Sequence, residues 1–152
     1  MEAAAAAIEA SAIGSFVRES AWAYPAANLV HLLGLVMLVG GIGILDLRLA
    51  GAFPALPIVP LSRALTPVAV AGLVLMAASG PLLFAADATA LVRSSTFGWK
   101  LALIAVALAN AAAFRWLWRG SGEPAPGLRA MALASVGLWL WVAALGRLIA
   151  YR

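Results

Sequence analysis

The chain has 152 residues, of which 65% are hydrophobic and 11% are charged, and its formal net charge at pH 7 is +4. Soluble domains carry about 45–50% apolar and about 25% charged residues, so this composition excludes a water-soluble globular domain and a disordered chain. The absence of cysteine excludes disulfides and thiolate metal sites, and the single histidine excludes a histidine-rich zinc site within one chain. The basic residues mostly flank apolar runs, which indicates a protein of the lipid bilayer and not a nucleic-acid-binding protein.

Residues 1–19 differ from the rest of the chain. They begin with the alanine-rich run Met1 to Glu9 and lack the basic start and long apolar centre of a signal peptide. We expect a short helix that lies at the membrane interface; the alternative is a flexible, solvated terminus. Residues 20–152 are expected to form one transmembrane domain.

Four apolar stretches follow, over residues 26–50, 65–86, 97–118 and 128–150. Each approaches or exceeds the ~20 residues that a helix needs to cross a bilayer. The connections between them are short, which places sequential helices side by side in opposite directions. The sequence therefore predicts an all-α fold, an up-down bundle of four transmembrane helices.

Prolines indicate where the second of these helices begins. Pro54, Pro57 and Pro60 recur at three-residue spacing and favour extended backbone. The pair Thr66-Pro67 is typical of a helix start, with an N-cap residue followed by proline in the first turn. We therefore expect the second helix to begin there.

The basic residues predict the orientation in the membrane. Four spans place the N-terminus, the second loop and the C-terminus on one side, together with Arg18, Arg93 and Arg152. The larger group of arginines flanks the first and third loops, which the positive-inside rule places in the cytoplasm, with both termini outside. This group consists of Arg48, Arg63, Arg115, Arg119 and Arg129.

Polar side chains inside the spans are the candidate functional residues, because an ionisable group there costs about 2.5–3.5 kcal/mol on insertion scales. His31 lies in the first span, with Asn28 about one turn above it, Lys100 opens the third span and Arg147 lies near the outer end of the fourth. Because the helices alternate in direction, these four residues are expected at a common height near the outer side.

Several interpretations of this layer remain open. His31 is a structural hydrogen-bonding residue, a haem ligand or a proton carrier, and Lys100 and Arg147 are either partners of a ligand or anchors that reach the headgroups. At the inner side, we expect Asp46 to form a structural ion pair with Arg115 or Arg129.

Small residues predict close helix contacts. Gly34 and Gly41 flank the polar face of the first span and are spaced for the close approach of another helix. The contact is either within one bundle or between copies of the chain, and we expect a homo-oligomer or a larger membrane complex.

Several motifs carry a family resemblance. They include the run Trp22 to Pro25, His31, the run Asp46 to Leu49, the run Gly80 to Phe84, and Lys100, together with Asn28, Gly34, Phe97 and Asn110. In these the chain resembles a family of small bacterial four-helix inner-membrane proteins of unknown function, which implies the fold and the bacterial inner membrane but no activity. It is more distantly similar to the copper-resistance protein CopD and the haem-pathway protein HemJ. In HemJ-like proteins the early-helix histidine is associated with haem binding, which implies His31 as the ligand and Lys100 as its companion cation.

These observations lead to a hypothesis of a small b-type haem protein for electron transfer or porphyrin handling. His31 is the expected axial ligand of the haem iron, Lys100 and Arg147 pair with the propionates, and Asn28 or a backbone carbonyl accepts the second ring N–H. With one histidine, the iron is five-coordinate or bridged by His31 of a second subunit. The alternative is a cofactor-free membrane anchor or accessory subunit. No catalytic residue is predicted, and a transporter is disfavoured because broken helices and carboxylate relays are absent from the sequence pattern.

The predicted orientation is testable by cysteine labelling. In Ser94→Cys, the second loop is expected to react with a membrane-impermeant maleimide from the periplasmic side. In Ser121→Cys, the third loop is expected to react only after the membrane is opened, because the arginine-flanked loops stay in the cytoplasm. The reverse pattern would invert the topology.

Overall fold

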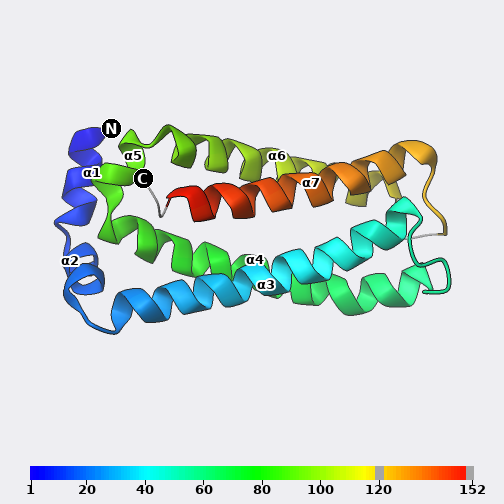
Figure 1. The fold of residues 1–152 in the computed structure, drawn as a ribbon, viewed down its shortest axis with the longest axis horizontal. Helices are drawn as coiled ribbons and strands as arrows, with labels where there is room; N and C mark the ends of the chain where they lie inside the picture. The colour runs from blue at the N-terminus through cyan, green and yellow to red at the C-terminus, as the bar shows by residue number, and fades with distance from the viewer. Residues whose placement is uncertain (119–121, 150–152) are drawn as a thin grey trace.

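The computed structural model describes residues 1–118 and 122–149, which are all-helical with no strand among them (Figure 1). Residues 119–121 and 150–152 lie outside this described part. They include the predicted end of the last span at residue 150, two of the arginines used to predict the orientation (Arg119 and Arg152) and the labelling position Ser121. The helices are α1 (Glu2–Glu9), α2 (Ala12–Glu19), α3 (Ala23–Ala50), α4 (Ile58–Ala86), α5 (Ala88–Arg93), α6 (Ser95–Trp118) and α7 (Pro126–Ile149).

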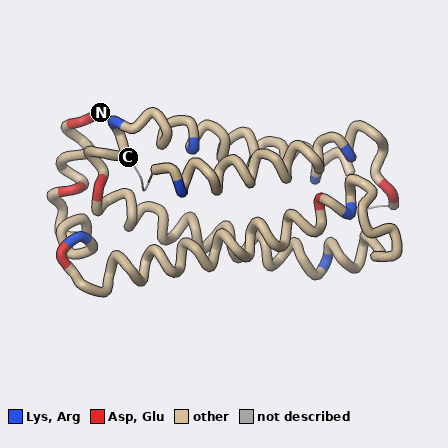
Figure 2. The backbone as a smooth tube through the Cα atoms, viewed as in Figure 1, with Lys and Arg blue, Asp and Glu red and all other residues tan. Residues whose placement is uncertain are grey.

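Helices α3, α4, α6 and α7 are each long and apolar enough to cross a membrane. The all-α four-helix bundle is thereby confirmed, and the chain is a multi-pass membrane protein. Figure 1 shows two layers, α3 with α4 and α6 with α7. Helix α3 packs on α4 and on α7, and α7 packs on α6, whereas the backbones of α4 and α6 do not approach each other. Figure 2 shows the charged residues gathered toward the two ends of the bundle.

Glycine allows the closest of these contacts, between α3 and α4. A Cβ atom placed on Gly34 would lie 2.7 Å from the carbonyl oxygen of Gly72, and one on Gly72 would lie 2.5 Å from that of Gly34. Gly41 also faces α4, and a Cβ atom placed on it would lie 3.2 Å from the carbonyl oxygen of Leu65. The two glycines that suggested self-association therefore serve packing within the chain, and they give no support to an interface between copies.

Helix α4 begins earlier than predicted. It starts at Ile58 with Pro57 as its N-cap residue, so Thr66 and Pro67 lie inside the helix and the predicted start there is wrong. The reason is that Pro60 falls in the first turn, where the backbone N–H groups have no intrahelical partner and proline costs little. Pro67 removes one helical hydrogen bond, yet the helix continues to Ala86.

The buried apolar side chains form two clusters along the bundle. One lies toward the end with the first and third loops and contains Leu45, Leu49, Ile58, Phe114, Trp118 and Ala132. The other lies nearer the middle and contains Leu38, Ala69, Ala107, Trp139 and Val142.

A buried arginine contacts both loops at one end of the bundle. The side chain of Arg48 is 6% exposed, its Nε donates to the carbonyl oxygen of Leu56 at 2.7 Å, and its Nη2 lies 2.7 Å from Oε1 of Glu123. Arg129 approaches the other carboxylate oxygen of Glu123 at 3.7 Å. Arg48 thus joins the end of α3 to both loops, in addition to its value as a topology signal.

The N-terminal segment is helical, as expected, but forms two short helices. Ser11 caps α2, and its side chain accepts a hydrogen bond from the backbone of Gly14 at 3.2 Å. Helices α1 and α2 lie across one end of the bundle (Figure 1), where α2 packs on α4 and α1 on α5. A Cβ atom on Gly14 would lie 2.8 Å from the carbonyl oxygen of Ala85, so glycine is needed for this close contact.

Polar contacts also hold α1 in place. Glu9 Oε2 accepts a hydrogen bond from the backbone N–H of Thr89 at 2.9 Å, and Arg93 pairs with Glu2 at 3.1 Å. The Thr89 bond, with the charge of Arg18 nearby, lowers the pKa of Glu9 below its usual value. A lowered carboxyl pKa means that this contact stabilises the segment above the ordinary pKa and is lost as the pH falls through the lowered one.

The Arg48 contacts predict a difference between two variants. Glu123→Gln removes the charge that pairs with a buried guanidinium and is expected to destabilise the fold by about 1–3 kcal/mol. Arg129→Gln removes a longer contact to the same carboxylate and a hydrogen bond to the carbonyl oxygen of Pro124, and because Arg129 is half-exposed it is expected to cost less than about 1 kcal/mol. Equilibrium unfolding in mixed micelles measures both; equal losses would contradict the role assigned to Arg48.

Candidate functional site

His31 forms a hydrogen bond that fixes the tautomer of its ring. Its Nδ1 lies 2.9 Å from Oγ of Ser79 on α4, and Ser79 Oγ donates its proton to the carbonyl oxygen of Leu75 at 2.7 Å. Because a hydroxyl has only one proton and that of Ser79 is placed to bond to Leu75, we infer that Nδ1 of His31 donates to Ser79 in the neutral ring. The Nε2 atom therefore carries a lone pair that this network does not use.

Lys100 brings a positive charge to the same layer. A Cβ atom on Gly146 of α7 would lie 3.2 Å from the Nζ of Lys100, so the absence of a side chain there makes room for the ammonium group. Lys100 is close enough to His31 for the two side chains to interact electrostatically. Among the described residues, no carboxylate lies within 4.0 Å of Lys100. Side chains from α3, α4 and α6 and a glycine of α7 therefore meet at one level.

The four residues predicted to form the site differ in their exposure and contacts. His31 and Lys100 are near enough to interact electrostatically. Asn28 is exposed, and Ser79 takes the place expected for Asn28 or a backbone carbonyl as acceptor of a ring N–H. Arg147 is exposed on α7, directly after Gly146. Sequence reasoning missed Ser79, whose only signal is a polar residue beside Gly80 and Pro81 in an otherwise apolar span.

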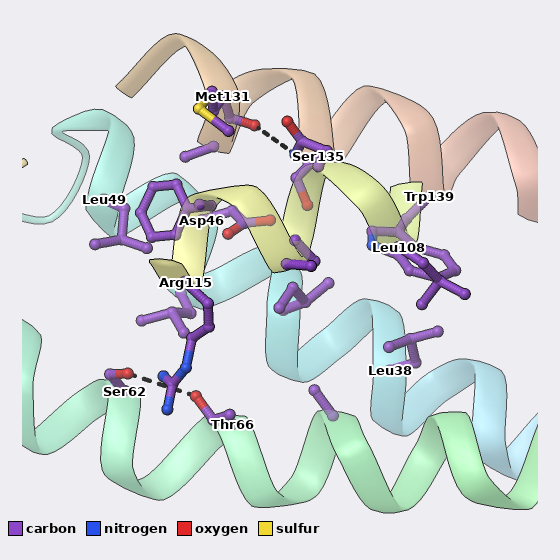
Figure 3. Close-up of a pocket in the computed structure, with 18 of the residues that line it drawn as sticks. Leu38, Asp46, Leu49, Ser62, Thr66, Leu108, Arg115, Met131, Ser135 and Trp139 are labelled. Atoms are coloured by element: carbon purple, nitrogen blue, oxygen red, sulfur yellow. Dashed lines mark hydrogen bonds between the residues drawn. The ribbon is translucent and has the colours of Figure 1, made fainter. Parts of the chain in front are cut away.

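A cleft of about 280 Å³ lies in the other half of the bundle, toward the first and third loops (Figure 3). All four long helices line it, and it follows the gap between α4 and α6. Its walls are mainly apolar. The polar lining residues are Asp46, Ser62, Thr66, Asn110, Arg115, Ser135 and Trp139.

Asp46 does not form the predicted ion pair. Its residue is 5% exposed, it forms no ion pair with a described residue, and Arg129 pairs with Glu123 in its place. Figure 3 shows the side chain of Arg115 extending toward α4, away from the carboxyl group of Asp46. The Ser135 hydroxyl supplies a hydrogen bond to the Asp46 carboxyl group, while its Oδ2 atom is buried with no partner.

Trp139 contains the second unpartnered polar atom of the cleft. Its residue is 3% exposed and its Nε1 is buried without an acceptor. The neighbouring polar groups are satisfied: Asn110 Nδ2 donates to the carbonyl oxygen of Met131 at 3.1 Å, and the hydroxyls of Ser62 and Thr66 lie 3.4 Å apart. The buried polar atoms without a partner thus come from α3 and α7.

Across residues 1–118 and 122–149, no group of three or more His, Cys, Asp or Glu side chains is placed to hold a metal ion. Comparisons with protein-family models, curated proteins and solved structures give no match for this chain. Any assignment of function therefore depends on the chemistry of its own residues.

The His31 network makes a spectroscopic prediction. In protein with ¹⁵N-labelled histidine, Nδ1 is expected to carry the proton of the neutral ring, because Ser79 accepts from it. Ser79→Ala is expected to shift the tautomer population toward Nε2–H, the form usually favoured in free imidazole side chains. Ser62→Ala, a serine of the same helix in the other half of the bundle, serves as the control and leaves the spectrum unchanged. A wild-type ring protonated at Nε2 would contradict the assignment.

Proposed function

We propose that this membrane protein binds haem b through Nε2 of His31 and serves electron transfer or porphyrin handling. One observation carries the proposal: Nδ1 of His31 lies 2.9 Å from the Ser79 hydroxyl, which also lies 2.7 Å from the carbonyl oxygen of Leu75. In this arrangement Nδ1 donates to Ser79, which leaves Nε2 as a metal-ligating lone pair near the ammonium group of Lys100. Metal-binding histidines commonly donate their other ring N–H to an acceptor that orients the ring. The donor set fits one axial position of a haem iron, with no second histidine in the chain.

The charge of Lys100 supports the same ligand. An ammonium group that enters the membrane region is expensive unless it pairs with an anion or reaches the headgroups. A haem carries both an iron atom for Nε2 and propionate groups for a cation, so one ligand satisfies His31 and Lys100 together. Arg147, one residue beyond Gly146, supplies a second cation near this level. Asn28, one turn above His31 on α3, is the remaining polar side chain assigned to the site. When bound, haem supplies one-electron redox chemistry.

The orientation that accompanies this proposal places the His31 layer in the periplasmic half of a bacterial inner membrane. Arg63, Arg115 and Arg129 lie at the end of the bundle with the first and third loops, which the positive-inside rule assigns to the cytoplasm. The α1 and α2 helices lie at the opposite end. The haem edge would then face redox partners or porphyrin carriers outside the cytoplasm.

A cofactor-free anchor or accessory subunit is the second candidate. The observation that favours it is the bond between His31 and Ser79 itself, because this bond links α3 to α4 and gives the histidine a structural purpose without any ligand. Hydrogen bonds between helices in membranes contribute about 0.6 kcal/mol on average.

Absorption spectra decide between the two candidates. Wild-type protein produced with ample haem is expected to show a Soret band and, in the reduced-minus-oxidised difference, an α-band. These bands are expected to disappear in His31→Ala, and Ser79→Ala is expected to weaken haem binding by about 10–100-fold because the ring loses its orienting partner. Lys100→Gln is expected to weaken binding without removing the axial ligand.

The exposed arginine of α5 provides a matched control, since Arg93 already pairs with Glu2 of α1 and Arg93→Gln is expected to leave the spectrum unchanged. A colourless wild-type protein, or bands that persist in His31→Ala, would overturn the haem assignment. The accessory-subunit candidate would then stand.

A further inference from the structure

The cleft between α4 and α6 contains two buried polar atoms with unmet hydrogen-bonding capacity, and the haem assignment uses neither of them. One is Oδ2 of Asp46 on α3, which can accept a hydrogen bond, and the other is Nε1 of Trp139 on α7, which can only donate one. Both residues line the cleft (Figure 3).

Leaving these atoms unpaired is costly. A buried donor or acceptor without a partner costs about 1–3 kcal/mol, and more for a charged group, so native structures pair nearly all of them. Asp46 has Ser135 as its hydrogen-bonding neighbour, Ser62, Thr66 and Asn110 bond elsewhere, and the side chain of Arg115 extends toward α4. A molecule bound in the cleft is the remaining source of partners.

We propose that the cleft binds an amphipathic molecule whose neutral head group carries a hydroxyl, the chemistry shared by hydroquinones and isoprenoid alcohols. A hydroxyl both donates and accepts, so such a head group offers a donor to Asp46 and an acceptor to Trp139. A lipophilic ammonium ion offers no acceptor for the indole N–H. An ether or ester offers no donor for the carboxylate.

The walls of the cleft fit this class of ligand. Apart from the polar residues already named, they consist of apolar side chains such as Leu38, Val70 and Leu108. The volume of about 280 Å³ is at the lower limit for a small-molecule site, so it suits a head group and the first part of a chain. Because the backbones of α4 and α6 stay apart, the apolar remainder of the ligand extends between these helices into the bilayer.

The test measures binding to the purified full chain in detergent, under anaerobic conditions, by isothermal titration calorimetry. The probes are a short-chain alkyl hydroquinone, its dimethyl ether and an isoprenoid alcohol of similar length. At least one of the two hydroxyl compounds is expected to bind at least tenfold more tightly than the dimethyl ether, which has lost its donors. The compound that binds shows whether the ligand is a hydroquinone or an isoprenoid alcohol. The proposal is overturned if neither hydroxyl compound binds, or if the dimethyl ether binds equally well.

Two variants with matched controls locate the binding. Trp139→Phe removes the indole N–H, together with part of the ring, and is expected to weaken binding about tenfold, equivalent to about 1.4 kcal/mol. Trp141→Phe changes a tryptophan of the same helix that is 61% exposed and is expected to leave the affinity unchanged. The second variant is Asp46→Leu, and its control is Asp87→Leu at the exposed end of α4. If Trp139→Phe and Trp141→Phe changed the affinity equally, the ligand would not bind at Trp139.

The last pair of variants separates binding from folding. Asp46→Leu replaces an unpaired buried carboxyl group with an apolar side chain of similar shape, so the fold is expected to keep or gain stability while binding is lost. Ala111→Leu fills the cleft from α6 and is expected to abolish binding without removing a polar group. Binding that survives Ala111→Leu would place the ligand elsewhere and contradict the proposal. His31→Ala is expected to bind the hydroxyl probe as wild type does, because the two sites use different residues.

Discussion

The close contact between α3 and α4 determines the positions of the other helices. Gly34 and Gly72 let the two backbones meet with no side chain between them. This contact brings His31 within hydrogen-bonding distance of Ser79. The backbone of α6 approaches α7 and not α3 or α4. Helix α6 meets α4 through side chains, among them the stacked rings of Phe97 and Phe84, whose centroids lie 5.7 Å apart.

Much of the fold follows from the sequence, because helix length and apolar periodicity in a membrane are strong constraints. The joint position of His31 and Lys100 also followed, since antiparallel helices of known length fix the height of each residue. The start of α4 could not be predicted, because a proline in the first turn of a helix and a proline in its interior look alike in sequence. The prediction of an ion pair for Asp46 was wrong for a different reason. Residues at one height of a bundle still point in different directions, and Arg115 extends toward α4.

Ser79 illustrates a further limit of sequence reasoning. A serine in an apolar helix usually bonds to the carbonyl group four residues before it, and Ser79 does so with Leu75. This ordinary bond orients the oxygen so that it accepts from His31, a consequence that depends on the register between α3 and α4. The pairing joins residues 48 positions apart, and no local pattern contains it. The unpartnered atoms of Asp46 and Trp139 likewise cannot be predicted from the sequence, because they depend on how the helices pack together.

The placement of α1 and α2 has a consequence for the order in which the chain matures. Most of their contacts are with α4 and α5, and the bonds of Glu9 to Thr89 and of Glu2 to Arg93 span 80 and 91 residues. During synthesis, α1 and α2 leave the ribosome before α4 and α5, so most of their docking surface does not exist until the second span has been inserted. Because α1 and α2 lie across one end of the finished bundle, their docking covers that end only after α3 and α4 have paired.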